Sequence, residues 1–101
     1  SFTQAVASYK KALKADPNDF KSAKQLGWAY IEGGQASSAR SAFSKAVSLR
    51  RSSSEAHYGL GMAFEELGSS SKALSEYETA LKLAPKGPDA PELRALISKM
   101  K

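Results

Sequence analysis

An internal repeat constrains the fold of this chain more than any other feature of its sequence. Residues of the same kind recur at a constant spacing of 34 positions. The matched rows are Ala5, Ala39 and Ala73; Tyr9, Phe43 and Tyr77; Ala12, Ala46 and Ala80; and Leu13, Val47 and Leu81. The segments LGWAY at 26–30 and LGMAF at 60–64 keep the same interval. A fixed period of this length indicates that one supersecondary unit is repeated along the chain.

The apolar residues within each unit are spaced as in amphipathic helices. Ala5, Tyr9, Ala12 and Leu13, for example, fall on one stripe of a helix. Clusters of Gly, Pro, Asp and Ser interrupt this pattern and mark the turns. The sequence therefore predicts an all-α protein with helices over 2–15, 19–32, 36–49, 54–67, 70–83 and 90–100. Asp89, with Glu92 three residues further on, predicts a capping box at the start of the last helix.

The 34-residue unit resembles the tetratricopeptide repeat in its residue pattern. Leu-Gly is followed by Tyr or Phe in the first helix, Ala39, Phe43 and Ala46 match the second helix, and Pro17 and Pro85 stand where the family closes its repeat. The resemblance implies a right-handed superhelical array of antiparallel helix pairs, an α-solenoid. It divides a single domain, 1–101, into a second helix without its first (2–17), two repeats (20–53 and 54–87) and a capping helix (89–101).

Small residues predict where the helices approach one another closely. Gly27, Gly61 and the alanine rows are expected at the crossings, because a larger side chain would hold the helices apart. Ala23 and His57 occupy positions where the family often carries a larger residue. Phe20 is expected to fill the room beside Ala23. His57 is expected to be a half-buried packing residue.

The resemblance also implies a ligand site, because the first helices of such arrays line a concave surface that binds peptides or extended protein segments. At about 100° per residue, Lys21, Lys24, Gln25 and Trp28 share the helix face that turns towards this surface. The lysines are expected to pair with acidic groups of the partner. On this interpretation, Trp28→Ala abolishes binding and leaves the stability nearly unchanged. In the alternative, Trp28 packs between neighbouring first helices and contacts no ligand.

The next repeat places Tyr58 and Met62 on the same surface. Aromatic and methionine side chains offer a large and adaptable contact area. Gly59 is expected to leave a gap that a bound backbone can approach. Together these residues predict a protein–protein interaction module with a groove for a peptide that contains acidic and apolar residues.

One ligand class known in the family fits this sequence poorly. Tetratricopeptide domains that hold the C-terminal carboxylate of heat-shock chaperones use a clamp of Lys, Asn and Arg side chains on successive first helices. Lys24 matches a clamp lysine, but Trp28 stands where the clamp has Asn, and Gly59 stands where a further polar contact is expected. The sequence therefore does not predict this function.

The first predicted helix lacks a preceding partner helix. Phe2, Val6, Tyr9 and Leu13 form its apolar stripe. We expect this stripe either to dock repeats upstream in a longer protein or to mediate self-association. The alternative to a peptide-binding function is thus a structural or self-assembly module. The chain begins with Ser1 rather than Met, so we expect it to be a piece of a longer protein.

Composition bears on the remaining classes of function. There is no cysteine, and His57 is the only histidine, so the sequence predicts neither a catalytic or metal site nor a cofactor, and no enzymatic activity. No apolar run approaches the roughly 18 residues of a membrane span. Residues 1–53 carry nine Lys and Arg against three Asp and Glu. The predicted helices divide these lysines between opposite sides, which argues against nucleic acid as a partner. The cellular compartment is left open.

Overall fold

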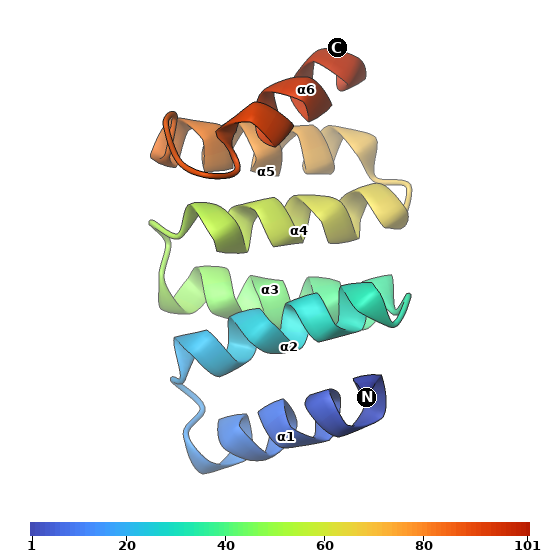
Figure 1. Ribbon diagram of the computed structural model, residues 1–101, viewed down its shortest axis with the longest axis vertical. Coiled ribbons are helices and arrows are strands. Elements are labelled where there is room, and N and C mark those ends of the chain that lie inside the picture. Colours follow the sequence, from blue (N-terminus) through green and yellow to red (C-terminus); the bar gives the residue numbers. More distant parts are fainter.

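The computed structural model describes residues 1–101 and consists of six helices joined by short turns (Figure 1). Each predicted helix is confirmed, with ends within one residue of those expected from the sequence. The helices are α1 (Phe2–Ala15), α2 (Phe20–Glu32), α3 (Ala36–Leu49), α4 (Ser54–Glu66), α5 (Ser70–Leu83) and α6 (Ala90–Met100). None of them combines the length and the hydropathy that a membrane crossing requires.

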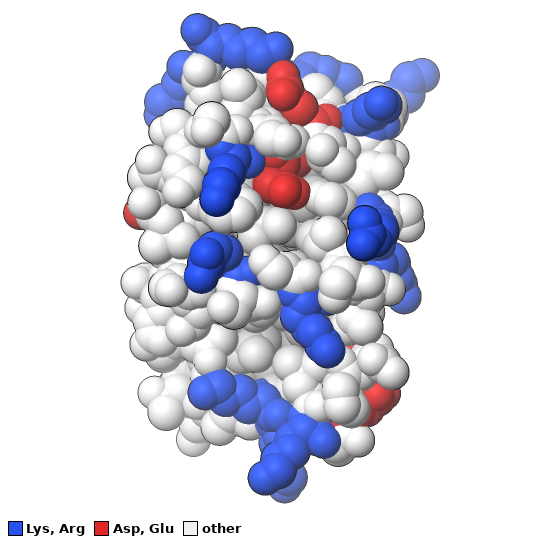
Figure 2. Space-filling model, turned by 180° about the vertical axis from the view of Figure 1, so that it is seen from behind, with Lys and Arg blue, Asp and Glu red and all other residues white.

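The helices stack in sequence order into an elongated body of 39 × 24 × 20 Å. Each helix packs on the next, and α2 also contacts α4. In Figure 1, α2, α4 and α6 lie in front, whereas α3 and α5 lie behind them. We call the surface over α2, α4 and α6 the first-helix face. The opposite surface, which Figure 2 shows, carries Lys and Arg over its whole height and only a few acidic side chains.

Local chemistry fixes where the helices begin and end. The carboxylate of Asp19 accepts hydrogen bonds from the backbone N–H of Ser22 at 3.1 Å and from its hydroxyl at 2.7 Å, which caps α2. Gly34 and Gly68 terminate the first helix of each repeat with φ of 72° and 81°, angles that favour glycine. The predicted capping box of Asp89 is wrong: its side chain makes no capping hydrogen bond, and a proline stands in the first turn of α6 instead.

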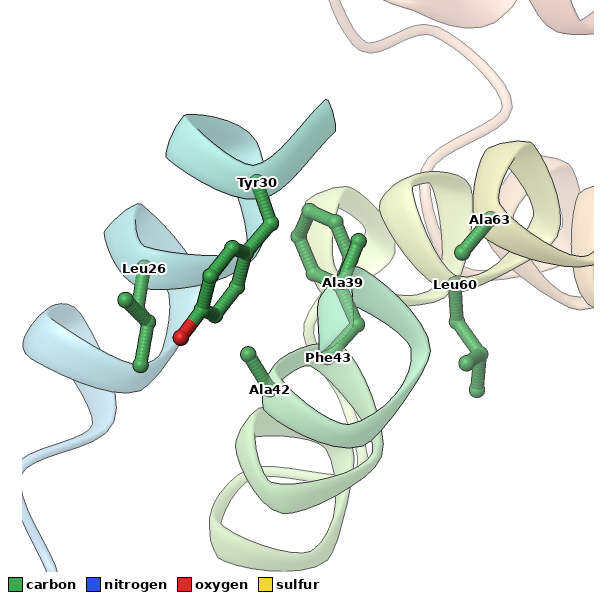
Figure 3. Packing of buried hydrophobic residues seen from close by; sticks show 7 residues of the cluster. All are labelled: Leu26, Tyr30, Ala39, Ala42, Phe43, Leu60 and Ala63. Atoms are coloured by element: carbon green, nitrogen blue, oxygen red, sulfur yellow. The ribbon is translucent and has the colours of Figure 1, made fainter. Parts of the chain in front are cut away.

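The ring of Phe43, on a second helix, lies in the core between successive helix pairs (Figure 3), and Tyr77 occupies the equivalent place in the next cluster. Phe43 and Tyr77 are fully buried. A Cβ atom added to Gly27 would lie 2.8 Å from the ring of Phe43, and one added to Gly61 would lie 2.6 Å from the ring of Tyr77. Both distances are too short for a side chain, so the expected role of these glycines at close helix crossings is confirmed.

Gly59 lies differently from the prediction. It is buried, and a Cβ atom at this position would collide with the ring of Phe43. The glycine is needed because the aromatic ring below α4 takes the space of its side chain. Gly59 therefore offers no open gap for a ligand backbone.

The smaller residues at two family positions are accommodated by their neighbours. Phe20 packs against the cluster that contains the fully buried Ala23, as the sequence predicts. The side chain of His57 is only 11% exposed. Its Nδ1 lies 2.7 Å from Oε1 of Glu76, and its Nε2 lies 2.9 Å from the carbonyl oxygen of Arg51. His57 thus ties the turn before α4 to α5 through hydrogen bonds as well as packing.

Candidate functional site

A pocket of about 350 Å³ opens between α4 and α6, with α5 at its base. Its lining combines apolar and aromatic side chains with three carboxylates: Tyr58, Met62, Glu65, Glu66, Tyr77, Glu92 and Leu96. Concave sites with a mainly apolar lining and a few polar groups are typical of ligand-binding sites. We call this site the α4–α6 pocket.

Helical spacing and the repeat bring these residues together. Tyr58 and Met62 lie one turn apart on α4 and so share a face. Glu92 and Leu96 follow them by 34 residues and take the equivalent places on α6. Tyr77 reaches the pocket from α5, with its ring centroid 6.0 Å from that of Tyr58.

Hydrogen bonding fixes the base of the pocket. The hydroxyl of the buried Tyr77 donates a 2.7 Å hydrogen bond to Oε1 of Glu65. Burial raises the pKa of Tyr77 strongly, and the hydrogen bond to Glu65 adds to this effect. Burial also raises the pKa of Tyr58, and the negative charges of Glu92 and Asp89 contribute. Both phenols are therefore neutral hydrogen-bonding groups at neutral pH.

Trp28 lies beside the pocket and is half-buried. Its ring packs edge-on against Phe43 at 5.0 Å and against Tyr58 at 5.9 Å between centroids. Its Nε1 donates a 2.8 Å hydrogen bond to Oε2 of Glu55. Trp28 thus bridges α2 and α4, which is the packing between first helices that the alternative interpretation of the sequence expects.

The structure divides the predicted groove into two places. Tyr58 and Met62 line the α4–α6 pocket, whereas Lys21 and Lys24 line a separate polar hollow of about 540 Å³ at the start of α2. Lys24 is already paired there, with its Nζ 2.9 Å from Oε1 of Glu55. Gln25 lines neither cavity and is half-exposed.

The sequence pattern places Glu66 on the same helix face as Tyr58 and Met62. Sequence reasoning missed the other members of the pocket, which are Glu65, Tyr77, Glu92 and Leu96. Extending the 34-residue spacing from Tyr58 and Met62 into α6 would have found Glu92 and Leu96. No comparable signal marks Glu65, because its position depends on the hydrogen bond from Tyr77.

The stripe of α1 is less exposed than the sequence suggests. Phe2, Val6, Tyr9 and Leu13 are half-buried and pack against the core cluster that contains Leu26 and Tyr30. A second set of α1 residues remains partly uncovered. The set Ala5, Tyr9 and Ala12 is half-buried, whereas its equivalents in α3 and α5 are fully buried. The reason is that α3 and α5 each pack against the first helix of their own repeat, and α1 has no such partner here.

The fold and the pocket define a class of protein: an all-α helical-repeat module with a recessed surface on one side of its first helices. The family model described as tetratricopeptide repeat matches residues 1–47 and 24–91. The chain therefore belongs to the tetratricopeptide repeat family. Repeats of this family are in general non-catalytic modules that mediate protein–protein interactions.

Solved structures agree with this assignment. The first repeat domain of Spaghetti (RPAP3), bound to the HSP90 peptide SRMEEVD, is 29% identical with a TM-score of 0.87 over 98% of this chain and 79% of that chain. MamA is 33% identical with a TM-score of 0.86, and this chain spans 58% of its length. The repeat domain of Arabidopsis OM64, at 22% identity and a TM-score of 0.91 over 99% of this chain and 80% of that chain, supports the fold alone. No curated protein sequence matches.

Proposed function

We propose that this domain binds an extended segment of a partner protein on its first-helix face, with one side chain of the segment packed against the apolar lining of the α4–α6 pocket. The observation that carries the proposal is the pocket itself. It lies on the face that this family uses for partners, and Tyr58, Met62 and Leu96 give it an apolar lining. Tyr residues in such positions are frequent binding anchors.

The bound segment would continue from the pocket along the rest of the first-helix face. It would pass over Tyr58 and the exposed part of Trp28, whose rings are in contact. Gln25 and Lys21 lie beyond them on α2, and Lys21 makes no ion pair. An acidic group of the partner would therefore find its complement at Lys21 rather than at Lys24, which Glu55 already neutralises.

The ligand of one similar structure does not transfer directly. The RPAP3 domain holds SRMEEVD, which is an acidic peptide. In this chain the pocket presents three carboxylates, and repulsion between like charges disfavours an acidic segment there. We therefore propose the mode of binding, along the first-helix face, and not the same peptide.

Selection followed by mapping tests this proposal. Heptapeptides are selected on the domain from a random phage-displayed library, and the strongest ones are titrated into ¹⁵N-labelled protein. We expect the largest shift changes at Tyr58, Met62 and Leu96. Leu96→Ala is expected to weaken binding about tenfold, because it removes part of the apolar lining. Leu83→Ala is the control, since Leu83 is 41% exposed outside the pocket.

The fold of both variants is checked by circular dichroism and urea titration. Shift changes confined to α3 and α5, or equal weakening by the two variants, would contradict the proposal. A library that yields no binder would contradict it as well.

The uncovered part of α1 supports a second candidate function, as a structural or self-assembly module. Ala5, Tyr9 and Ala12 form a half-buried face of α1, and the residues at the equivalent positions of α3 and α5 are fully buried. A concentration-dependent sedimentation coefficient that Ala12→Glu abolishes would support self-association through this face. Ala7→Glu is the matched control, because Ala7 is exposed on the same helix. A coefficient that does not change with concentration would exclude self-association.

A further inference from the structure

We infer that the α4–α6 pocket selects a positively charged side chain, Arg or Lys, flanked by an apolar residue of the partner segment. This inference rests on the proposed binding along the first-helix face and adds the chemistry of the anchoring residue. The lysines in the first half of the chain favour acidic residues in the partner, whereas this pocket favours a basic one.

The charges around the pocket are of one sign. Glu65, Glu66 and Glu92 line it, and no Lys or Arg does. All three ion pairs of the structure lie elsewhere and involve other carboxylates. Three carboxylates without a cation form a local negative potential that a partner cation would neutralise.

The apolar part of the lining distinguishes this site from a solvated acidic surface. The rings of Tyr58 and Tyr77, inclined by 61°, stand beside Met62 and Leu96. The methylene stem of an Arg or Lys can pack along such a wall while its charged end reaches the carboxylates. Contact of the cation with a tyrosine ring adds to the attraction.

The available hydrogen-bonding groups favour the same choice. The hydroxyl proton of Tyr77 is already donated to Glu65, so the base of the pocket presents acceptors rather than donors. A guanidinium or ammonium group brings only donors and matches them. A carboxylate would be repelled by Glu65, Glu66 and Glu92, and the hydroxyl of Tyr58 is the side-chain donor of the lining that would face it.

The sign of the charge changes along the first-helix face. At repeat-equivalent positions α2 carries Lys24, α4 carries Tyr58 and α6 carries Glu92. A second row runs from Lys21 through Glu55 to Asp89. The partner segment therefore has its basic residue at the α6 end, and its acidic residues lie towards α2.

Three blocked tripeptides test the inference: Ac-Leu-Arg-Leu-NH₂, the same peptide with citrulline, and the same peptide with Glu. Citrulline keeps the shape of Arg without its charge. Each is titrated into ¹⁵N-labelled protein, and the shifts of Tyr58, Met62 and Leu96 give its dissociation constant. We expect the Arg peptide to bind about tenfold more tightly than the citrulline peptide and the Glu peptide to bind most weakly.

Substitutions in the pocket then test whether the carboxylates cause the preference for the Arg peptide. Glu66→Gln and Glu92→Gln are each expected to weaken binding of the Arg peptide about two- to fivefold and to weaken the citrulline peptide less, because the citrulline peptide loses no charge–charge attraction. Glu32→Gln is the matched control, because Glu32 precedes Glu66 by 34 residues on an equivalent face and does not line the pocket. It is expected to change nothing.

The outcomes separate this inference from the proposed function. Equal binding of the Arg and citrulline peptides in the pocket would overturn the charge selection and leave the apolar binding mode in place. Tightest binding of the Glu peptide would also overturn it. If no tripeptide shifts these residues up to its solubility limit, the inference fails, and the selected heptapeptides alone decide the proposed function.

Discussion

Trp28 and Glu55 join the first helices of the two repeats through a 2.8 Å hydrogen bond from the indole Nε1 to Oε2. The other oxygen of Glu55 lies 2.9 Å from Nζ of Lys24. One carboxylate therefore holds two residues of α2 from its place on α4. The Glu55 side chain is 43% exposed, so solvent weakens the ion pair more than it weakens the hydrogen bond to the half-buried indole.

We predict that Glu55→Ala lowers the free energy of unfolding by about 1 kcal/mol, because both interactions are lost. Glu55→Gln should cost less, since an amide oxygen still accepts from Trp28. Urea denaturation measures both, and the tryptophan emission maximum of the Ala variant should move to the red. Unchanged stability and emission in Glu55→Ala would show that the link does not form in solution.

We predict that Trp28→Ala lowers the free energy of unfolding by about 2–4 kcal/mol, because its ring packs on the fully buried Phe43 and on Tyr58. This differs from the expectation drawn from sequence, in which the substitution affects binding alone. Thermal and urea denaturation check the prediction. If the variant is as stable as the parent, Trp28 does not contribute to stability, and the expectation from sequence that it serves ligand binding alone would hold.

We predict that Gly59→Ala destabilises the domain by about 1–3 kcal/mol, although alanine is the better helix former by about 1 kcal/mol. The added methyl group would meet the ring of the buried Phe43, which has no room to move. The same substitution combined with Phe43→Leu should cost less than the sum of the two changes. Strict additivity of the two substitutions would argue against the contact.

We predict that Tyr77→Phe changes the alkaline end of the stability profile. The pKa of Tyr77 is raised above its ordinary value of 10.0, chiefly by burial. A raised pKa means that the folded state holds the proton more tightly, so stability is constant below pH 10 and falls as the pH rises further. The Phe variant should lose less stability between pH 10 and 12, measured by urea titration. Identical profiles would contradict this assignment.

We predict that the two aspartates at helix starts differ in their effect on stability. Asp19 caps α2, and its hydrogen bonds with Ser22 hold its pKa below the ordinary 3.8. A lowered pKa means that its contribution is complete above pH 3.8 and is lost as the pH falls through the lower folded value. Asp19→Ala should therefore lower Tm at pH 7 and have a smaller effect at the lowest pH that leaves the protein folded. Asp89→Ala, which removes no capping hydrogen bond, should leave Tm nearly unchanged.

The arrangement of helices could be predicted from the sequence because its signals are local and periodic. A spacing of 34 residues repeats in Phe43 and Tyr77, and both rings are fully buried, as their rows imply. Helix ends are determined by nearby residues such as Gly34 and Gly68. Their positive φ angles end the helix locally and do not depend on tertiary contacts. The uncapped Asp89 shows the limit of this reasoning, since a capping pattern does not guarantee the side-chain geometry.

The site could be predicted only in part. The rotation of 100° per residue placed Tyr58 and Met62 on one face of their helix, and the resemblance to the family implied that this face is the one that binds partners. Only the tertiary structure decided what lies opposite each of them. The packing of α4 on α2 sets Glu55 against Trp28 and turns Gly59 onto Phe43, and the packing of α6 on α5 brings Glu92 and Leu96 to the pocket. Periodicity within a helix fixes which face a residue is on, whereas the approach of separate helices fixes its neighbours and the charge they present.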